Sequence, residues 1–311
     1  MEKFDIFSIL QLLGGLAFFL YGIYIMSSGL EKIAGGKLEK ILKTMTSSPA
    51  KGLILGAGIT AVIQSSSAVT VMLVGLVNSG IMKLSQAIGV IMGSNIGTTI
   101  TAWILSLSGI QSDNVFIRLF KPESFTPLLA LIGVIMIFAA RSNKNKNTGS
   151  VLLGFSILMT GMIFMSTSME PLSHSPKFIE LLTLFKNPIF GVIVGTVITA
   201  VIQSSAASVG MLQALVMKVD MTYSMALPII MGQNIGTCIT AIISSIGVNS
   251  NARKVAVVHV IFNIIGTVIF LSAYELVRLL FNLPFMNTNI NPAGIAILHS
   301  TFNILSLIHI S

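Results

Sequence analysis

The sequence has few charged residues and a single cysteine. Lys, Arg, Asp and Glu make up 9% of its 311 residues, and the mean hydropathy is +0.92. A soluble domain carries about 25% charged residues, because its surface must be solvated. The composition therefore predicts an integral membrane protein. Because Cys238 has no partner in the chain, a secreted disulfide scaffold is excluded.

Other classes are excluded by further absences. The net charge of +8 comes from basic residues between apolar runs, without a basic face carrying interleaved aromatics, so no nucleic-acid partner is expected. The runs do not alternate as in a β-barrel, and continuous stretches of about 20 apolar residues suit helices that cross a lipid bilayer. No small-residue cleavage site follows the first run, which predicts a retained helix. The predicted fold class is an all-α polytopic membrane protein.

Two of the apolar runs are interrupted. The runs fall at about 8–30, 52–78, 84–108, 125–140, 150–169, 189–217, 222–247, 254–274 and 293–310. Polar clusters break 52–78 and 189–217 midway, and each of these runs begins beside a proline, Pro49 or Pro188. A helix broken at membrane depth is tolerated only where protein or a cavity surrounds its free backbone groups. We therefore expect two re-entrant helical hairpins.

The charges agree with this topology. With both hairpins re-entrant, one membrane face collects eleven basic and two acidic residues, and the other collects seven basic and eight acidic ones. The positive-inside rule then places the amino terminus outside and the 141–149 loop in the cytoplasm. Residues 31–51 and 178–185 show apolar positions at helical spacing, which indicates interfacial amphipathic helices, with solvated connectors as the alternative.

The chain contains an internal duplication. A shift of 139 positions superimposes Ile59–Ser66 on an identical Ile198–Ser205, and Met92-Gly-x-Asn-Ile-Gly-Thr98 on Met231-Gly-x-Asn-Ile-Gly-Thr237. The same shift brings Glu31 onto Glu170. Three membrane-spanning segments lie between corresponding positions of the two copies. Because this number is odd, the second copy has the opposite orientation in the membrane. Inverted repeats with interrupted helices at matching positions are typical of secondary transporters.

A single transmembrane transport domain is expected over residues 1–311. Its parts are repeat 1 (about 12–110), a connecting helix and loop (111–149), repeat 2 (about 150–250) and additional helices (251–311). The chain stops inside an apolar helix that lacks charged anchors, which predicts a truncated last segment.

The two polar clusters are the candidate site. They comprise Gln64, Ser65, Ser66 and Ser67 in the first copy and Gln203, Ser204 and Ser205 in the second. A broken helix exposes N–H groups at the positive start of its second half, so the cluster can hold an anion without a fixed positive charge. Its hydroxyl and amide oxygens suit a small cation. The alternative is helix–helix packing through Ser and Gly.

Acidic residues are missing where a proton relay would need them. There is no Asp or Glu between Glu39 and Asp113, nor between Glu180 and Asp220. This absence favours coupling to sodium over coupling to protons.

A second polar motif follows each hairpin. We expect Asn95, Thr98 and Thr99, with Asn234 and Thr237, to line the same cavity from a locally loosened helix; close packing by the bracketing glycines is the alternative. His259 and His299 each begin His-x-x-Phe-Asn, in which His and Asn share a helical face. These residues favour a structural pairing over a gating role.

The paired motifs resemble a known family. Gln-Ser-Ser-Ser, followed in the next apolar run by Gly-Ser-Asn-Ile-Gly-Thr-Thr, with both repeated, closely resembles the bacterial type II sodium/phosphate cotransporters over residues 12–110 and 151–250. The resemblance implies inorganic phosphate as substrate, sodium as the co-transported ion, no other cofactor, and a multi-pass protein of the inner (cytoplasmic) membrane. It also suggests a PhoU-like domain or protein as a partner. Two positions depart from the pattern: Ala206 replaces the third hydroxyl, and Gln233 stands opposite Ser94.

The residues leave other functions open. Transport of another small oxyanion, phosphate export, and a membrane sensor with a vestigial transport core are the alternatives. An enzyme is not expected, because the sequence shows no nucleophile–base pair, metal cluster or nucleotide loop.

Overall fold

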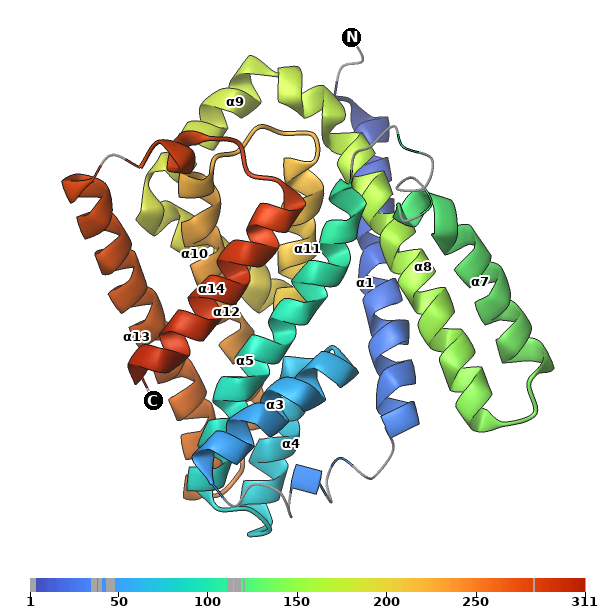
Figure 1. Cartoon of the computed structure of the whole chain (residues 1–311), viewed down its shortest axis with the longest axis vertical. Coiled ribbons are helices and arrows are strands. Elements are labelled where there is room, and N and C mark those ends of the chain that lie inside the picture. The colour runs from blue at the N-terminus through green and yellow to red at the C-terminus, as the bar shows by residue number, and fades with distance from the viewer. Residues whose placement is uncertain are drawn as a thin grey trace.

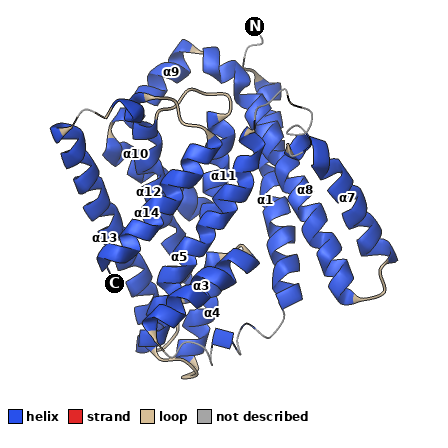
Figure 2. Cartoon of the chain, in the orientation of Figure 1, coloured by secondary structure: helices blue, strands red, loops and turns tan. Residues whose placement is uncertain are grey.

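The computed structural model describes residues 4–34, 38, 41–42, 48–110, 114, 119, 121–281 and 283–310. These residues form helices and loops, with no strand among them (Figure 2). Within the described ranges, six helical stretches are long and apolar enough to cross a membrane. They are α1 (Ile6–Ala34), α5 (Leu84–Ser106) with a short 3-10 turn, α7 (Pro122–Ala139), α8 (Asn143–Met169) with a 3-10 turn, α12 (Tyr223–Ser244) and α13 (Ser250–Leu280). The chain is therefore an all-α membrane protein.

The interrupted runs form pairs of short helices. The first run gives α3 (Pro49–Ile63) and α4 (Ser66–Asn78), and the second gives α10 (Pro188–Ile202) and α11 (Ser205–Val216). A 15-residue helix is about 22 Å long, less than the roughly 30 Å of a hydrocarbon core. No arm of either pair is long enough to cross a bilayer by itself. The other α-helices of the described residues are α9 (Pro176–Leu182) and α14 (Pro292–Ile310).

The duplicated sequence produces duplicated secondary structure. The first residues of α3 and α10, of α4 and α11, and of α5 and α12 are related by the same shift that superimposes the two sequence copies. Figure 1 shows α3 and α4 in the lower half of the molecule and α10 and α11 in the upper half. The long helices α1, α7 and α8 lie together on one side of both hairpins.

Glycines show the direction in which the helices of each copy run. A Cβ atom on Gly89 would overlap the carbonyl oxygen of Pro49, and one on Gly97 would overlap that of Ala57. Residue numbers rise together along the two helices, so α3 and α5 run parallel. Helix α4 must therefore carry the chain back to the end at which α3 began. Gly236 of α12 approaches α10 in the same way, so each pair of short helices is a hairpin.

The first helices of the two copies pack against each other in opposite directions. Gly15 approaches Gly161, and Gly22 approaches the carbonyl oxygen of Gly154, so residue numbers fall along α8 as they rise along α1. The contacts are backbone to backbone, because these glycines have no side chain to separate the helices. Since α1 and α8 hold corresponding positions, this pair has the orientation that the predicted inversion requires.

Two expectations about local structure are wrong. The expected loop over 141–149 is helical from Asn143 onward, because the Ser142 hydroxyl accepts a hydrogen bond from the Asn145 N–H at 3.1 Å and caps α8. The segments around Asn95 and Asn234 are continuous helix rather than loosened helix. Their bracketing glycines allow close packing against the backbones of α3 and α10.

Of the two segments predicted to be amphipathic helices, only the second is described in full. Most of 35–47 lies outside the described residues. In the second segment, α9 continues into a 3-10 turn, Thr183–Lys186. Leu182 is buried there, and Phe178 and Phe185 pack against the same core cluster. Leu181 stays exposed. The segment thus covers the base of the second hairpin.

Candidate functional site

Both hairpins turn at a glutamine with an unusual backbone. Gln64 and Gln203 have φ values of 61° and end α3 and α10 in the left-handed conformation; among the described residues they are the only non-glycine residues with positive φ. Glycine is the usual residue at such a helix end. An L-residue there costs roughly 1–2 kcal/mol. Strained backbone positions cluster at functional sites, so a polar side chain kept at such a position is a candidate for ligand binding.

A serine follows each glutamine and starts the next helix. The Ser65 hydroxyl accepts a hydrogen bond from the Ala68 N–H at 3.2 Å, and the Ser204 hydroxyl accepts one from the Ala207 N–H at 3.2 Å. These caps satisfy one N–H at each helix start. The first N–H groups of α4 and α11 have no acceptor inside their own helix. They form a positive helix end that is suited to an anion.

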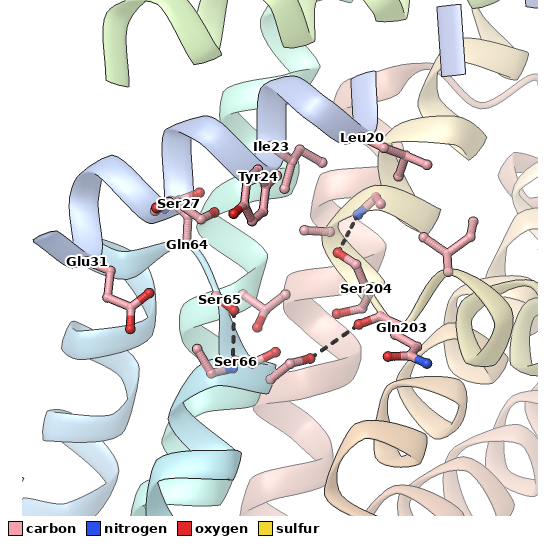
Figure 3. A pocket seen from close by; sticks show the side chains of 18 residues that line it. Leu20, Ile23, Tyr24, Ser27, Glu31, Gln64, Ser65, Ser66, Gln203 and Ser204 are labelled. Carbon is pink, nitrogen blue, oxygen red and sulfur yellow. Dashed lines mark hydrogen bonds between the residues drawn. The ribbon is translucent and has the colours of Figure 1, made fainter. Parts of the chain in front are cut away.

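The two hairpin tips meet at one cavity of about 540 Å³ (Figure 3). The Ser67 hydroxyl donates to the backbone carbonyl of Gln203 at 3.4 Å and links the two tips directly. Eight of the twelve predicted site residues line this cavity: Gln64, Ser65, Ser66, Ser67, Thr98, Gln203, Ser204 and Ser205. The structure thus brings together polar clusters from the two copies of the repeat.

The two glutamines are not equivalent in this structure. The Gln64 side chain is buried; its Oε1 accepts from the Thr101 hydroxyl at 2.7 Å and its Nε2 donates to the Ala61 carbonyl. Gln203 is exposed, and no described residue hydrogen-bonds its side-chain amide. Gln203 therefore has an amide available to a ligand, whereas the protein itself satisfies Gln64.

The second polar motif lies mostly behind the cavity. Only Thr98 reaches the wall. The Asn95 amide donates to Asn263 Oδ1 at 3.2 Å, and the Asn234 amide donates to Asn303 Oδ1 at 2.7 Å. The hydroxyls of Thr99 and Thr237 are used within their own helices.

The two His-x-x-Phe-Asn segments make the same internal hydrogen bond. The Asn263 amide donates to the His259 carbonyl at 2.9 Å, and the Asn303 amide donates to the His299 carbonyl at 2.8 Å. In each case the amide is held so that its oxygen faces an asparagine of a repeat. Helices α13 and α14 therefore fasten α5 and α12 through matching Asn–Asn bonds.

We expect Asn263→Ala to lower stability by about 1–3 kcal/mol, because it leaves the buried Asn95 amide without an acceptor. Asn303→Ala should act alike through Asn234. Thermal unfolding in detergent measures both. Unchanged stability with lost transport would contradict this role, because it would mean that the asparagines act on the transported ions directly.

Sequence reasoning missed one wall of the cavity. Helix α1 contributes Tyr24, Ser27, Ser28 and Glu31, which share one face of the helix. The available signal was a serine pair in an apolar helix together with the recurrence of Ser27 and Glu31 at corresponding positions of the second copy.

A family sequence model described as Na+/Pi-cotransporter matches the chain twice, over residues 18–167 and 157–291. The chain belongs to the Na+/Pi-cotransporter family. Its two matches correspond to the two copies of the repeat. No solved structure matches the chain.

Relatives span bacteria and mammals. The uncharacterized protein YqeW of Bacillus subtilis is 29% identical over 82% of this chain and 78% of its own length. The putative inorganic phosphate export protein YjbB of Escherichia coli is 23% identical over 86% of this chain and 47% of its own. The sodium-dependent phosphate transport protein 2A of Rattus norvegicus is 34% identical over 47% of this chain and 24% of its own. The chain thus spans less than half of the latter two proteins.

Proposed function

We propose that this member of the family moves inorganic phosphate across the cytoplasmic membrane by sodium-coupled symport, with alternating access to the cavity between the hairpin tips. One observation carries the proposal: a Gln-Ser-Ser cluster from each repeat faces the same cavity. A site between two repeats is accessible from either side when the repeats rock against each other. Membership in a transporter family also supports a non-enzymatic role.

The cavity suits a small oxyanion. Two helix starts, at Ser66 and Ser205, supply N–H donors, and the serine hydroxyls and the Gln203 amide add others. Among the described lining residues there is no Lys, Arg or His. Binding would therefore rely on dipoles and neutral donors, and a bound anion would need a cation beside it. This requirement links the two fluxes, with sodium held by oxygens of the same motifs.

Phosphate export is a second candidate, favoured by the name of the Escherichia coli relative. The same site would serve either direction, since direction follows from the gradients that drive the cycle.

Sodium-gradient uptake tests the proposal. The purified protein in proteoliposomes should accumulate radiolabelled phosphate when sodium is higher outside, and should not do so with an equal potassium gradient. Loading vesicles with phosphate and reversing the gradient measures export in the same preparation. Folded protein that moves phosphate in neither direction in sodium would overturn the assignment.

A further inference from the structure

The cavity contains a carboxylate that the transport proposal does not use. Glu31 lines it from α1, one helical turn beyond Ser27 on the same face (Figure 3). Tyr24, also on α1, is the other ionisable residue among the described residues of the wall, and neither hairpin contributes one. The formal charge of this wall at neutral pH is therefore that of Glu31 alone.

Glu170, which corresponds to Glu31 in the second copy, has a different environment. Glu170 forms an ion pair with Lys218, whose Nζ lies 2.9 Å from Glu170 Oε2, and neither residue lines the cavity. The position that corresponds to Lys218 in the first copy is Ser79, which carries no charge. Within the described part of the chain, Glu31 has no ion pair. The duplication has thus kept a carboxylate twice, and the described residues pair only one of them.

Glu31 shares its face of α1 with two serines that also line the cavity. The Ser27 hydroxyl, one turn earlier, is buried and has no hydrogen-bond partner in the described structure. The Ser28 hydroxyl lines the same wall. Carboxylate and hydroxyl oxygens are hard ligands, which suit small hard cations. An anion in this cavity would be repelled by Glu31 unless a cation lay between them.

We propose that Glu31 binds the co-transported monovalent cation on the α1 wall and thereby makes anion binding depend on that cation. This inference rests on the proposed transport function and adds a ligand outside the duplicated Gln-Ser-Ser motifs. It explains why the wall carries a negative charge in a cavity built for an anion: the empty cavity attracts the cation first, and the cation then removes the repulsion.

The sodium dependence of phosphate uptake tests Glu31→Gln, with Glu170→Gln as the matched control. Glu31→Gln should raise the sodium concentration at half-maximal uptake roughly tenfold or more, since a charged ligand is lost. Uptake at saturating sodium should be largely restored. Glu31→Asp should fall between the wild type and Glu31→Gln. Glu170→Gln should follow the wild-type curve, because Glu170 lies outside the cavity.

Direct binding separates this inference from the transport proposal. Binding of radioactive sodium to detergent-solubilised protein, without phosphate, should weaken in Glu31→Gln and stay unchanged in Glu170→Gln, even if the transported anion is not phosphate. Gel filtration of each variant checks its folding. A wild-type sodium curve in folded Glu31→Gln would overturn the inference. So would a variant that loses only the pH dependence of uptake, because Glu31 would then bind a proton.

Discussion

Replacing Gln203 with alanine is expected to raise the KM for phosphate about 10- to 100-fold, the loss expected for one hydrogen bond to a charged ligand. The reason is its free amide: Gln203 is exposed at the hairpin tip and no described residue bonds its side chain. Alanine keeps a side-chain Cβ in the same left-handed backbone, so the fold should be retained. The measurement is initial uptake rate against phosphate concentration at saturating sodium.

Gln64→Ala is the informative comparison. Its amide is already bonded by Thr101 and Ala61, so this substitution should lower thermal stability as well as transport. Gln203→Gly should remain at least as stable as the wild type, because glycine adopts positive φ without strain, while transport falls as in Gln203→Ala. A Gln203→Ala variant with wild-type KM would contradict the assignment of this amide to the substrate.

Gly56→Ala is expected to destabilise the protein by about 3 kcal/mol or more, at the upper end of the cost of overpacking. A Cβ atom there would overlap the Val90 backbone, which cannot rotate away as a side chain could. Gly58→Ala is the matched control on the same helix, since a Cβ at Gly58 meets nothing within 4 Å. The melting temperature in detergent, followed by fluorescence-detected gel filtration, should separate the two.

The second copy repeats the test. Gly195 faces the carbonyl oxygen of Ile229 as Gly56 faces that of Val90, so Gly195→Ala should lose stability to a similar degree. Equal melting temperatures for Gly56→Ala and Gly58→Ala would show that α3 and α5 do not approach so closely.

The hairpin breaks were predictable because their chemistry is local. Gln64-Ser65 and Gln203-Ser204 interrupt apolar runs, and Ser caps the helix that follows, so the sequence marks the break to the residue. The constant offset of 139 positions between the two sequence copies then predicted the position of the second break. Thr98, which the sequence predicted to face a cavity, lies in the cavity wall. Whether these residues bind phosphate or sodium stays a prediction.

The contribution of α1 and the true place of the asparagines could not be predicted in the same way. Which face of α1 meets the hairpins depends on its packing against α8, a contact between segments that are distant in the sequence. Asn95 faces α13 rather than the cavity because Asn263 offers it an acceptor. Gly-x-Asn-Ile-Gly looks like a helix breaker, but the glycines accommodate a neighbouring backbone, and only the tertiary structure reveals that neighbour.

The symmetry of the glycine contacts between α1 and α8 has a consequence for the relative free energies of the conformational states in the proposed cycle. Gly15 meets Gly161 as Gly154 meets Gly22, so exchanging the roles of the two copies would recreate the same contact. In the alternating-access cycle that we propose, this exchange relates the two access states, so the contact has the same free energy in both and cannot favour either one. A preference for one of these states would then arise where the two copies differ. These differences include Ser94 against Gln233, Ser67 against Ala206, and Glu31, without an ion pair among the described residues, against the Glu170–Lys218 pair. Substitutions that make the two copies identical at these positions should bring the populations of the two states closer to equality.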